Sequence, residues 1–236
     1  MKFTFYFFYI FYSLFSIFVV DLQAQDVYRF KKADPQGSGK FYLGREIAPV
    51  MSHYGIGWLE RSEREEEENV SLLLKNMALK PGETVADIGA GSGYHSIRMA
   101  AMVGNQGRIK AIDIQPEMLQ FLREKLQNVG VGNVDLVQGT EKSLQLPENS
   151  VDKMLLVDVY HEFSFPLEMG KSMFNSLKKG GKVYLIEYRA EDPTVPIKTL
   201  HKMTEKQAIA EMQAVGFRFV KNMDNLPWQH CLIFTK

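Results

Sequence analysis

The chain has 236 residues, with 28 Lys and Arg against 28 Asp and Glu, five His and one Cys. Because 45% of the residues are hydrophobic, the composition excludes a disordered chain, and the zero net charge argues against a dedicated nucleic-acid binder. A single cysteine excludes an intramolecular disulfide, and no spacing of Cys and His is typical of a zinc site, so we predict no metal.

The first 24 residues differ in composition from the rest of the chain. Lys2 precedes an apolar run over residues 3–20, and Ala24 is a small residue at the end of the segment. This pattern is typical of a secretory signal peptide, although a run of this length also suits a single membrane anchor. We expect export, periplasmic or secreted, or membrane association through residues 3–20. Basic residues within 29–32 leave open an anchor whose following domain faces the cytoplasm.

Two short regions follow before the main domain. Residues 25–43 are polar and rich in Gly, which predicts a tether, and residues 44–80 show helical spacing of apolar residues up to the stop at Pro81. The acidic stretch 61–68 is expected to be a solvated helix start. The alternative is that Arg61 or Arg64 faces an acidic substrate.

Strands and helices alternate over residues 81–236. Apolar runs end at Ile88, Ile114, Val137, Val159 and Tyr188, and amphipathic stretches occupy 93–103, 116–128, 166–178 and 205–214. This alternation predicts an α/β fold, with a mostly parallel sheet covered by helices on both faces. The last two apolar runs, Phe217–Val220 and Cys231–Phe234, flank a short turn and predict a C-terminal antiparallel hairpin.

A glycine-rich turn follows the first strand of this domain. Residues 84–96 read as a strand, a turn and a helix start, with G-x-G-x-G spacing from Gly89. Glycine lets the backbone approach a ligand closely. A dinucleotide site requires G-x-G-x-x-G/A, and Tyr94 stands at the last small position, which disfavours a nucleotide-dependent oxidoreductase. Asp87, two residues before the first glycine, would repel a pyrophosphate and attract a cationic ligand.

Asp113 ends the second strand, twenty residues after Gly93. A carboxylate at the carboxyl end of a strand can accept hydrogen bonds from both hydroxyls of a ribose. The alternative is an Asp that only starts the turn before Pro116. We prefer the ribose role, since the glycine turn and Asp113 lie at adjacent strand ends, where open α/β sheets bind ligands.

These features resemble the class I S-adenosylmethionine-dependent methyltransferases, of the broad kind that includes ubiquinone and menaquinone biosynthesis methyltransferases. The resemblance covers residues 70–236 and is carried by residues 85–93, Asp113, and the segments 146–152 and 177–182. It implies a Rossmann-like, seven-stranded, mostly parallel sheet with the C-terminal antiparallel hairpin, after a short N-terminal helical extension. It also implies S-adenosylmethionine as the cofactor.

The resemblance further implies where the cofactor lies. The glycine turn and Asp87 would hold its methionine part, and Asp113 its ribose. Relatives often place an acid after the third strand against the adenine, whereas here Thr140 takes that position and Glu141 is the alternative contact. The cofactor-binding residues implied are Asp87, Gly89, Ala90, Gly91, Gly93, Asp113, Ile114, Thr140, Glu141 and Asp158.

The residues after the fourth strand are the catalytic candidates. In relatives this edge faces both cofactor and substrate, and it carries Tyr160 and His161. His161 is a candidate general base, with a histidine that hydrogen-bonds a loop as the alternative. His201 lies in the insert 189–203, where relatives cover the substrate. We expect methyl transfer by in-line displacement to a small-molecule or lipid-like acceptor. The alternative is a non-catalytic S-adenosylmethionine-binding or interaction module of the cell envelope.

Overall fold

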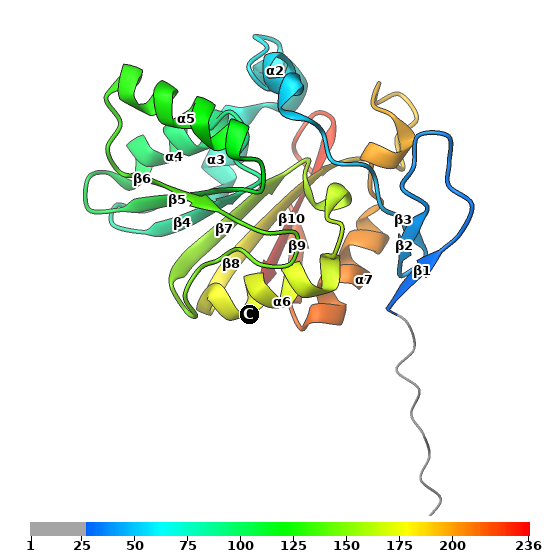
Figure 1. The fold of residues 1–236 in the computed structure, drawn as a ribbon. Coiled ribbons are helices and arrows are strands. Elements are labelled where there is room, and N and C mark those ends of the chain that lie inside the picture. Colours follow the sequence, from blue (N-terminus) through cyan, green and yellow to red (C-terminus); the bar gives the residue numbers. More distant parts are fainter. Residues whose placement is uncertain (1–26) are drawn as a thin grey trace, which may run out of the picture.

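A seven-stranded sheet forms the centre of the molecule. The structure is a computed structural model that describes residues 27–236, so the predicted signal peptide or anchor lies outside the described residues (Figure 1). The strand order is β6-β5-β4-β7-β8-β10-β9, and β10 runs antiparallel to both of its neighbours. The strands are β4 (Thr84–Ile88), β5 (Arg108–Asp113), β6 (Val134–Gln138), β7 (Val151–Val157), β8 (Leu177–Tyr188), β9 (Arg218–Asn222) and β10 (Gln229–Thr235).

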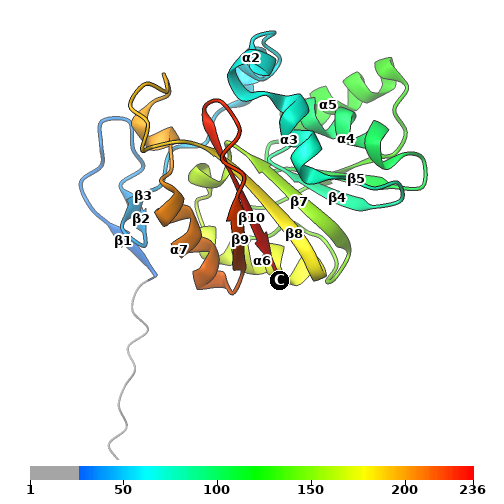
Figure 2. The ribbon, with the colours of Figure 1, turned by 180° about the vertical axis from the view of Figure 1, so that it is seen from behind.

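Helices cover both faces of this sheet, as the alternation of strands and helices predicted. The helices α3 (Val70–Met77), α4 (Tyr94–Val103) and α5 (Pro116–Val129) lie on one face, and α6 (Pro166–Ser176) and α7 (Glu205–Val215) on the other (Figures 1 and 2). The predicted Rossmann-like fold with its C-terminal hairpin is therefore confirmed. Among residues 27–236, no helix combines the length and apolar character needed to cross a membrane.

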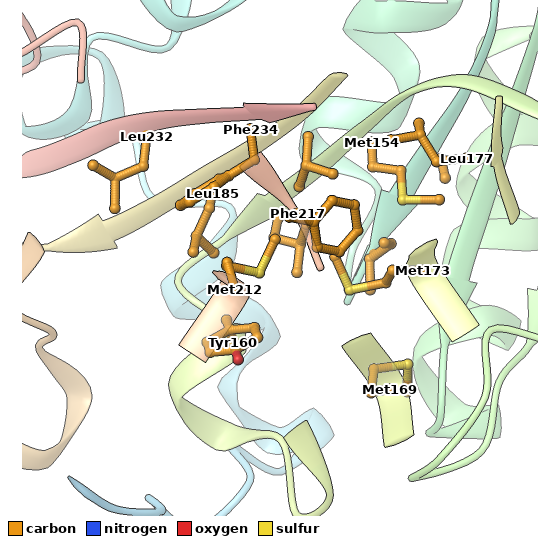
Figure 3. Close-up of a cluster of buried hydrophobic side chains, with 14 of the residues drawn as sticks. Met154, Tyr160, Met169, Met173, Leu177, Leu185, Met212, Phe217, Leu232 and Phe234 are labelled. Atoms are coloured by element: carbon orange, nitrogen blue, oxygen red, sulfur yellow. The ribbon is translucent and has the colours of Figure 1, made fainter. Parts of the chain in front are cut away.

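Successive residues of β7 face opposite sides of the sheet and belong to two different hydrophobic cores. Met154 and Leu156 pack toward α6 and α7, whereas Leu155 packs toward α3 and α4. This is the two-residue period of a strand buried on both faces. Figure 3 shows the first of these cores, in which Met173 of α6 and Met212 of α7 meet the sheet. Burial on both sides fixes the register of β7 and hence the position of the residues that follow it.

The prediction of a polar tether over 25–43 was wrong for most of that segment. The strands β1 (Tyr28–Phe30), β2 (Lys40–Tyr42) and β3 (Arg45–Glu46) form a separate antiparallel sheet beside α7 (Figures 1 and 2). Lys40 places its Nζ 3.4 Å from the ring centre of Phe165, and the Tyr28 hydroxyl donates to Glu168. These contacts join residues that are far apart in the sequence, so the composition of residues 25–43 alone could not predict them.

The helical extension predicted for 44–80 is also interrupted. After β3 come a 3₁₀ turn (His53–Gly55), α1 (Ile56–Leu59), α2 (Arg64–Glu68) and then α3. Asn69 ends α2 in the left-handed conformation, and its side chain accepts a hydrogen bond from Leu72 N at the start of α3. The break therefore has a local cause, since the same asparagine ends one helix and caps the next.

Candidate active site

The glycine turn between β4 and α4 is shaped by close approach as well as by backbone conformation. Gly89 and Gly91 have φ values of +71° and +52°, which a side chain disfavours. A Cβ on Gly89 would lie 2.4 Å from Val159 Cγ2, and one on Gly91 would lie 2.7 Å from Leu59 Cδ1. The turn is therefore enclosed between the segment after β7 and the N-terminal extension.

Asp113, the last residue of β5, is fixed by backbone donors. Its Oδ2 accepts a hydrogen bond from Gly91 N at 2.9 Å, and its Oδ1 accepts one from Gln115 N at 2.9 Å. Burial raises the pKa of Asp113, while these N–H groups act in the opposite direction. The carboxylate thus spans from the glycine turn to the start of α5, on the wall of a cleft.

That cleft brings together most of the residues predicted to hold the cofactor. Its wall includes seven of them: Gly89, Gly91, Asp113, Ile114, Thr140, Glu141 and Asp158. Apolar side chains of Ile112, Met118 and Leu144 add a surface suited to a flat ring. Thr140 and Glu141 lie at the exposed rim of the cleft.

Three predicted cofactor residues lie behind the cleft wall. Asp87 is buried and accepts a hydrogen bond from Ser96 Oγ at 2.6 Å, and burial raises its pKa to about 6. Gly93 packs against α5, since a Cβ there would lie 2.1 Å from Leu122 Cδ1. Ala90 belongs to the apolar cluster formed with the same helix. In this structure these three residues support the glycine turn and do not line the cleft.

Asp158 supplies an observation that tests the fit of a cationic cofactor. It has a φ of +50°, and its Oδ2 accepts from Gln229 Nε2 at 2.6 Å. Its Oδ1 is buried and has no hydrogen-bond partner within residues 27–236. Burial raises the pKa of Asp158 well above its usual range, and the nearby carboxylates of Glu68 and Glu187 raise it further. An unsatisfied buried acceptor suits a positively charged ligand, so this wall fits a sulfonium or an ammonium group.

A second cavity adjoins the cofactor cleft. The two share Met51, Leu59, Val157, Asp158 and Glu162 as lining residues. Beyond this shared wall, the second cavity is lined by apolar residues such as Trp58 and Ile197 and by charged or polar ones. A molecule in the second cavity would therefore lie next to a molecule in the cleft.

The predicted solvated helix start over 61–68 is borne out in part. Glu65 and Glu66 are exposed in the first turn of α2, whereas other residues of the stretch are buried and line the second cavity. Arg64 and Glu68 are only 4% and 2% exposed, and they form an ion pair of 2.7 Å. Arg61 also bonds Glu68 and lies 3.6 Å from the ring centre of Trp58. Both arginines line the cavity, but each already has a carboxylate partner from its own chain segment.

The structure separates the two catalytic candidates. His161 lines the second cavity, with Nδ1 2.6 Å from Glu187 Oε2 and Nε2 3.0 Å from His201 Nδ1. Tyr160 lies instead in the core on the α6 and α7 side, fully buried (Figure 3). Burial raises the pKa of Tyr160 well above its usual range. Its side chain is thus placed to pack, not to react.

Two acidic residues of this site were missed in the sequence. Glu187 is fully buried near the end of β8, and Glu162 directly follows His161. The available signal was an acid within the otherwise apolar end of the fifth strand, Tyr184–Tyr188, because a buried acid needs a partner.

Comparisons with known proteins agree with this geometry. The family model described as "Methyltransferase domain" matches residues 79–229. The ubiquinone/menaquinone biosynthesis C-methyltransferase UbiE of Enterobacter sp. (strain 638) is 34% identical over 111 residues, which are 47% of this chain and 44% of that protein. The corresponding protein of Salmonella arizonae gives the same identity and coverage. The matched part is thus less than half of the length of these relatives.

Solved structures show the same architecture. A SAM dependent methyltransferase from Aquifex aeolicus superimposes with a TM-score of 0.74 and 25% identity, over 78% of this chain and 98% of that one. A putative type 11 methyltransferase from Sulfolobus solfataricus shares the fold, with a TM-score of 0.60, 21% identity, and coverage of 72% and 93%.

The central sheet, the glycine turn and the acid at the end of β5 define a class I S-adenosylmethionine-dependent methyltransferase fold. This chain belongs to the methyltransferase-domain family of that class, and the cofactor of the class is S-adenosylmethionine.

Proposed function

We propose that the protein transfers the methyl group of S-adenosylmethionine to a small molecule bound in the second cavity. The observation that carries this proposal is the shared wall, in which Asp158 and Glu162 line both cavities. Methyl transfer needs donor and acceptor side by side and in line. Holding two reactants in this way contributes about 7–11 kcal/mol to lowering a barrier.

The residues of this chain have separable tasks in such a reaction. Asp113 and the glycine turn would hold the ribose and the methionine part, and Asp158 would face positive charge. When bound, S-adenosylmethionine supplies a methyl group on a positively charged sulfur. Apolar residues of both cavities exclude water from the reacting groups.

His161 is the residue best placed to take a proton from the acceptor. Glu187 binds Nδ1, which leaves Nε2 directed toward the second cavity and His201. Such an arrangement fixes the tautomer and makes Nε2 the base. A base of this kind contributes about 10²–10⁴-fold for a hydroxyl or ammonium acceptor and is unnecessary for an already nucleophilic one.

The lining of the second cavity supports an acceptor of mixed character. Trp58, Pro196 and Ile197 offer apolar contact, while Lys198 offers a positive charge. The name of the Enterobacter relative refers to quinone biosynthesis, which supports an acceptor with an apolar ring or chain. We include lipid-like molecules of this kind in the proposal.

The test is a transfer assay with the full-length protein and methyl-labelled S-adenosylmethionine. A small-molecule fraction and a lipid extract of the host serve as acceptors. We expect label in one product, lost in His161→Gln and in Asp158→Asn but retained in Asp135→Asn, whose carboxylate lies on β6 outside both cavities. Binding of S-adenosylmethionine without transfer to either fraction would contradict the proposal and indicate a binding module.

We also propose that residues 1–24 direct the protein into the export route, with an anchor as the alternative fate. The proposal rests on the apolar run 3–20 after Lys2 and on Ala24. N-terminal sequencing of the protein from its own host tests it. A start near Gln25 is expected. An intact Met1 together with a domain shielded from external protease would contradict export.

A further inference from the structure

Three side chains of the kinds that can ligate a metal ion converge on the second cavity. His161 and Glu162 come from the 3₁₀ turn after β7, and His201 comes from the 3₁₀ turn before α7. One ligand atom from each lies within 4.8 Å of the other two. All three residues line the second cavity, so the point between them can be reached by a ligand. Forty residues separate the two histidines, which explains why sequence spacing predicted no metal.

The distances between these atoms suit a single ion. His161 Nε2 lies 3.0 Å from His201 Nδ1, and Glu162 Oε1 lies 3.8 Å and 3.5 Å from these two nitrogens. The circle through the three atoms has a radius of about 2.0 Å, which matches Zn–N and Zn–O bonds of about 2.0–2.2 Å. An ion slightly above this plane would have three protein ligands and an open fourth position.

The ligand atoms are also oriented by neighbours. Glu187 Oε2 lies 2.6 Å from His161 Nδ1, so the free lone pair of the ring is on Nε2. Glu162 Oε2 accepts a hydrogen bond from Met51 N at 3.1 Å, which leaves Oε1 facing the histidines. A carboxylate behind a histidine ligand is the usual outer partner at protein metal sites, where it fixes the tautomer and the direction of the ring.

The charge around the cluster favours a cation. Glu162, Glu187 and Asp158 are close together, and none of them forms an ion pair with a lysine or arginine within residues 27–236. Arg64 acts on Asp158, and Arg45 on Glu187, only from a longer distance. The nearby arginines form ion pairs with other acids: Arg61 and Arg64 with Glu68, and Arg45 with Glu211. Buried carboxylates without cationic partners are costly, and a bound divalent ion would compensate them.

We propose that His161, Glu162 and His201 bind a divalent transition-metal ion, with zinc as the best match to two nitrogen ligands and one oxygen ligand. The open position faces the second cavity, where an oxygen or sulfur atom of the acceptor can complete the coordination. This role of the ion rests on the proposed methyl transfer, whereas binding of the ion does not.

The ion would then replace His161 as the means of activating the acceptor. An acceptor O–H or S–H on the ion loses its proton to solvent more readily, because the cation stabilises the resulting anion. A lone pair of that oxygen or sulfur forms the new bond to the methyl carbon. The bond from carbon to the positive sulfur breaks, and its electron pair stays on that sulfur, which becomes neutral.

The test is titration of the chelator-treated full-length protein with Zn²⁺ by calorimetry and with Co²⁺ by visible absorption. We expect one ion per chain and a Co²⁺ spectrum of low coordination number. His201→Ala and Glu162→Gln should each weaken Zn²⁺ binding by at least about 10-fold, and Glu187→Gln, which leaves the ligands in place, by about 10–100-fold. His201 is the most exposed of the three ligands, at 28%, so its variant is the least demanding on folding.

His230→Ala is the matched control. His230 is buried on β10 and pairs with Glu191 at 3.0 Å, outside both cavities, so its loss should leave Zn²⁺ affinity unchanged. Equal Zn²⁺ affinities of wild-type protein and His201→Ala would overturn the site and leave a metal-free hydrogen bond between the two histidines. Tight Zn²⁺ binding without methyl transfer would uphold the site and reject the proposed function, so the two failures are distinguishable.

Discussion

Arg45 holds Glu211 through two parallel hydrogen bonds, Nε to Oε1 at 2.7 Å and Nη2 to Oε2 at 2.9 Å. Burial lowers the pKa of Arg45, but the bonds and charge of Glu211 outweigh it and raise the pKa. The third nitrogen, Nη1, donates to the carbonyl oxygen of His161 at 2.9 Å. One guanidinium therefore connects the N-terminal sheet, α7 and the turn that carries the site.

We expect Arg45→Met to lower the free energy of unfolding by about 3–5 kcal/mol, because it leaves Glu211 buried and unpaired. The double variant Arg45→Met/Glu211→Met should recover most of this loss, since both charges are then removed. Urea unfolding measures both effects. Lys110→Met, at the more solvent-accessible pair with Asp135, is the control and should cost about 0–1 kcal/mol. A double variant no more stable than Arg45→Met would contradict the explanation.

The main sheet could be predicted because its signals are local. Each strand of residues 84–188 is an apolar run followed by an amphipathic helix or a turn, and the structure confirms this order. The helix predicted over 205–214 has a local start signal as well, because Thr204 and Gln207 have the spacing of a capping box and the Thr204 hydroxyl accepts a hydrogen bond from Gln207 N. The glycine turn and Asp113 lie at adjacent strand ends for the same topological reason.

The substrate side could not be predicted in the same way. His161 is brought to His201 by a turn after β8, and to Glu187 by the pairing of β7 with β8. The N-terminal sheet is held by Arg45 on a helix that begins 160 residues later. Such contacts depend on tertiary packing, which neither periodicity nor composition of a short segment records.

Asp113→Ala should weaken S-adenosylmethionine binding. Loss of charge-assisted hydrogen bonds to the ribose costs about 1.5–3 kcal/mol, which is roughly 10–150-fold in the dissociation constant. Calorimetry with the folded variant measures the change. Asp135→Ala removes a half-buried carboxylate on the neighbouring strand β6, outside both cavities, and should bind as wild type does. Unchanged affinity in folded Asp113→Ala would remove this residue from the cofactor site.

Gly91 and Gly104 provide a matched pair for the glycine turn. Both have positive φ, +52° and +66°, but a Cβ would meet Leu59 at Gly91 and nothing within 4 Å at Gly104. Alanine at either position costs about 1 kcal/mol or more in strain. Only Gly91→Ala should also weaken cofactor binding, and Gly91→Val should abolish it. Equal ligand affinity in Gly91→Val and wild type would show that the glycines serve only the fold.

The raised pKa of Asp87 makes the stability of the protein depend on pH, with a defined sign. Burial raises its pKa from 3.8 to about 6, although the hydrogen bond from Ser96 opposes the shift. The folded state therefore binds the proton more tightly than the unfolded state does. Stability contributed by the protonated form is lost as pH rises from 3.8 toward 6 and stays lost above that. The total is about 3 kcal/mol, from about 1.4 kcal/mol per pKa unit.

Asp87→Asn should remove this loss. The free energy of unfolding of the variant, relative to that of wild type, should therefore increase by up to about 3 kcal/mol as the pH rises from acid to neutral. Urea unfolding across that range measures the difference.

Asp152→Asn is the control of opposite sign. Burial favours its neutral form, but bonds from Lys178 and Thr84 N outweigh burial and lower its pKa, so that wild-type stability falls toward acid pH. An ionised Asp87 beneath the glycine turn favours a cationic ligand, so we expect wild-type affinity for S-adenosylmethionine to rise through about pH 6, with a flatter profile in Asp87→Asn. Parallel stability curves for wild type and Asp87→Asn would contradict the raised pKa.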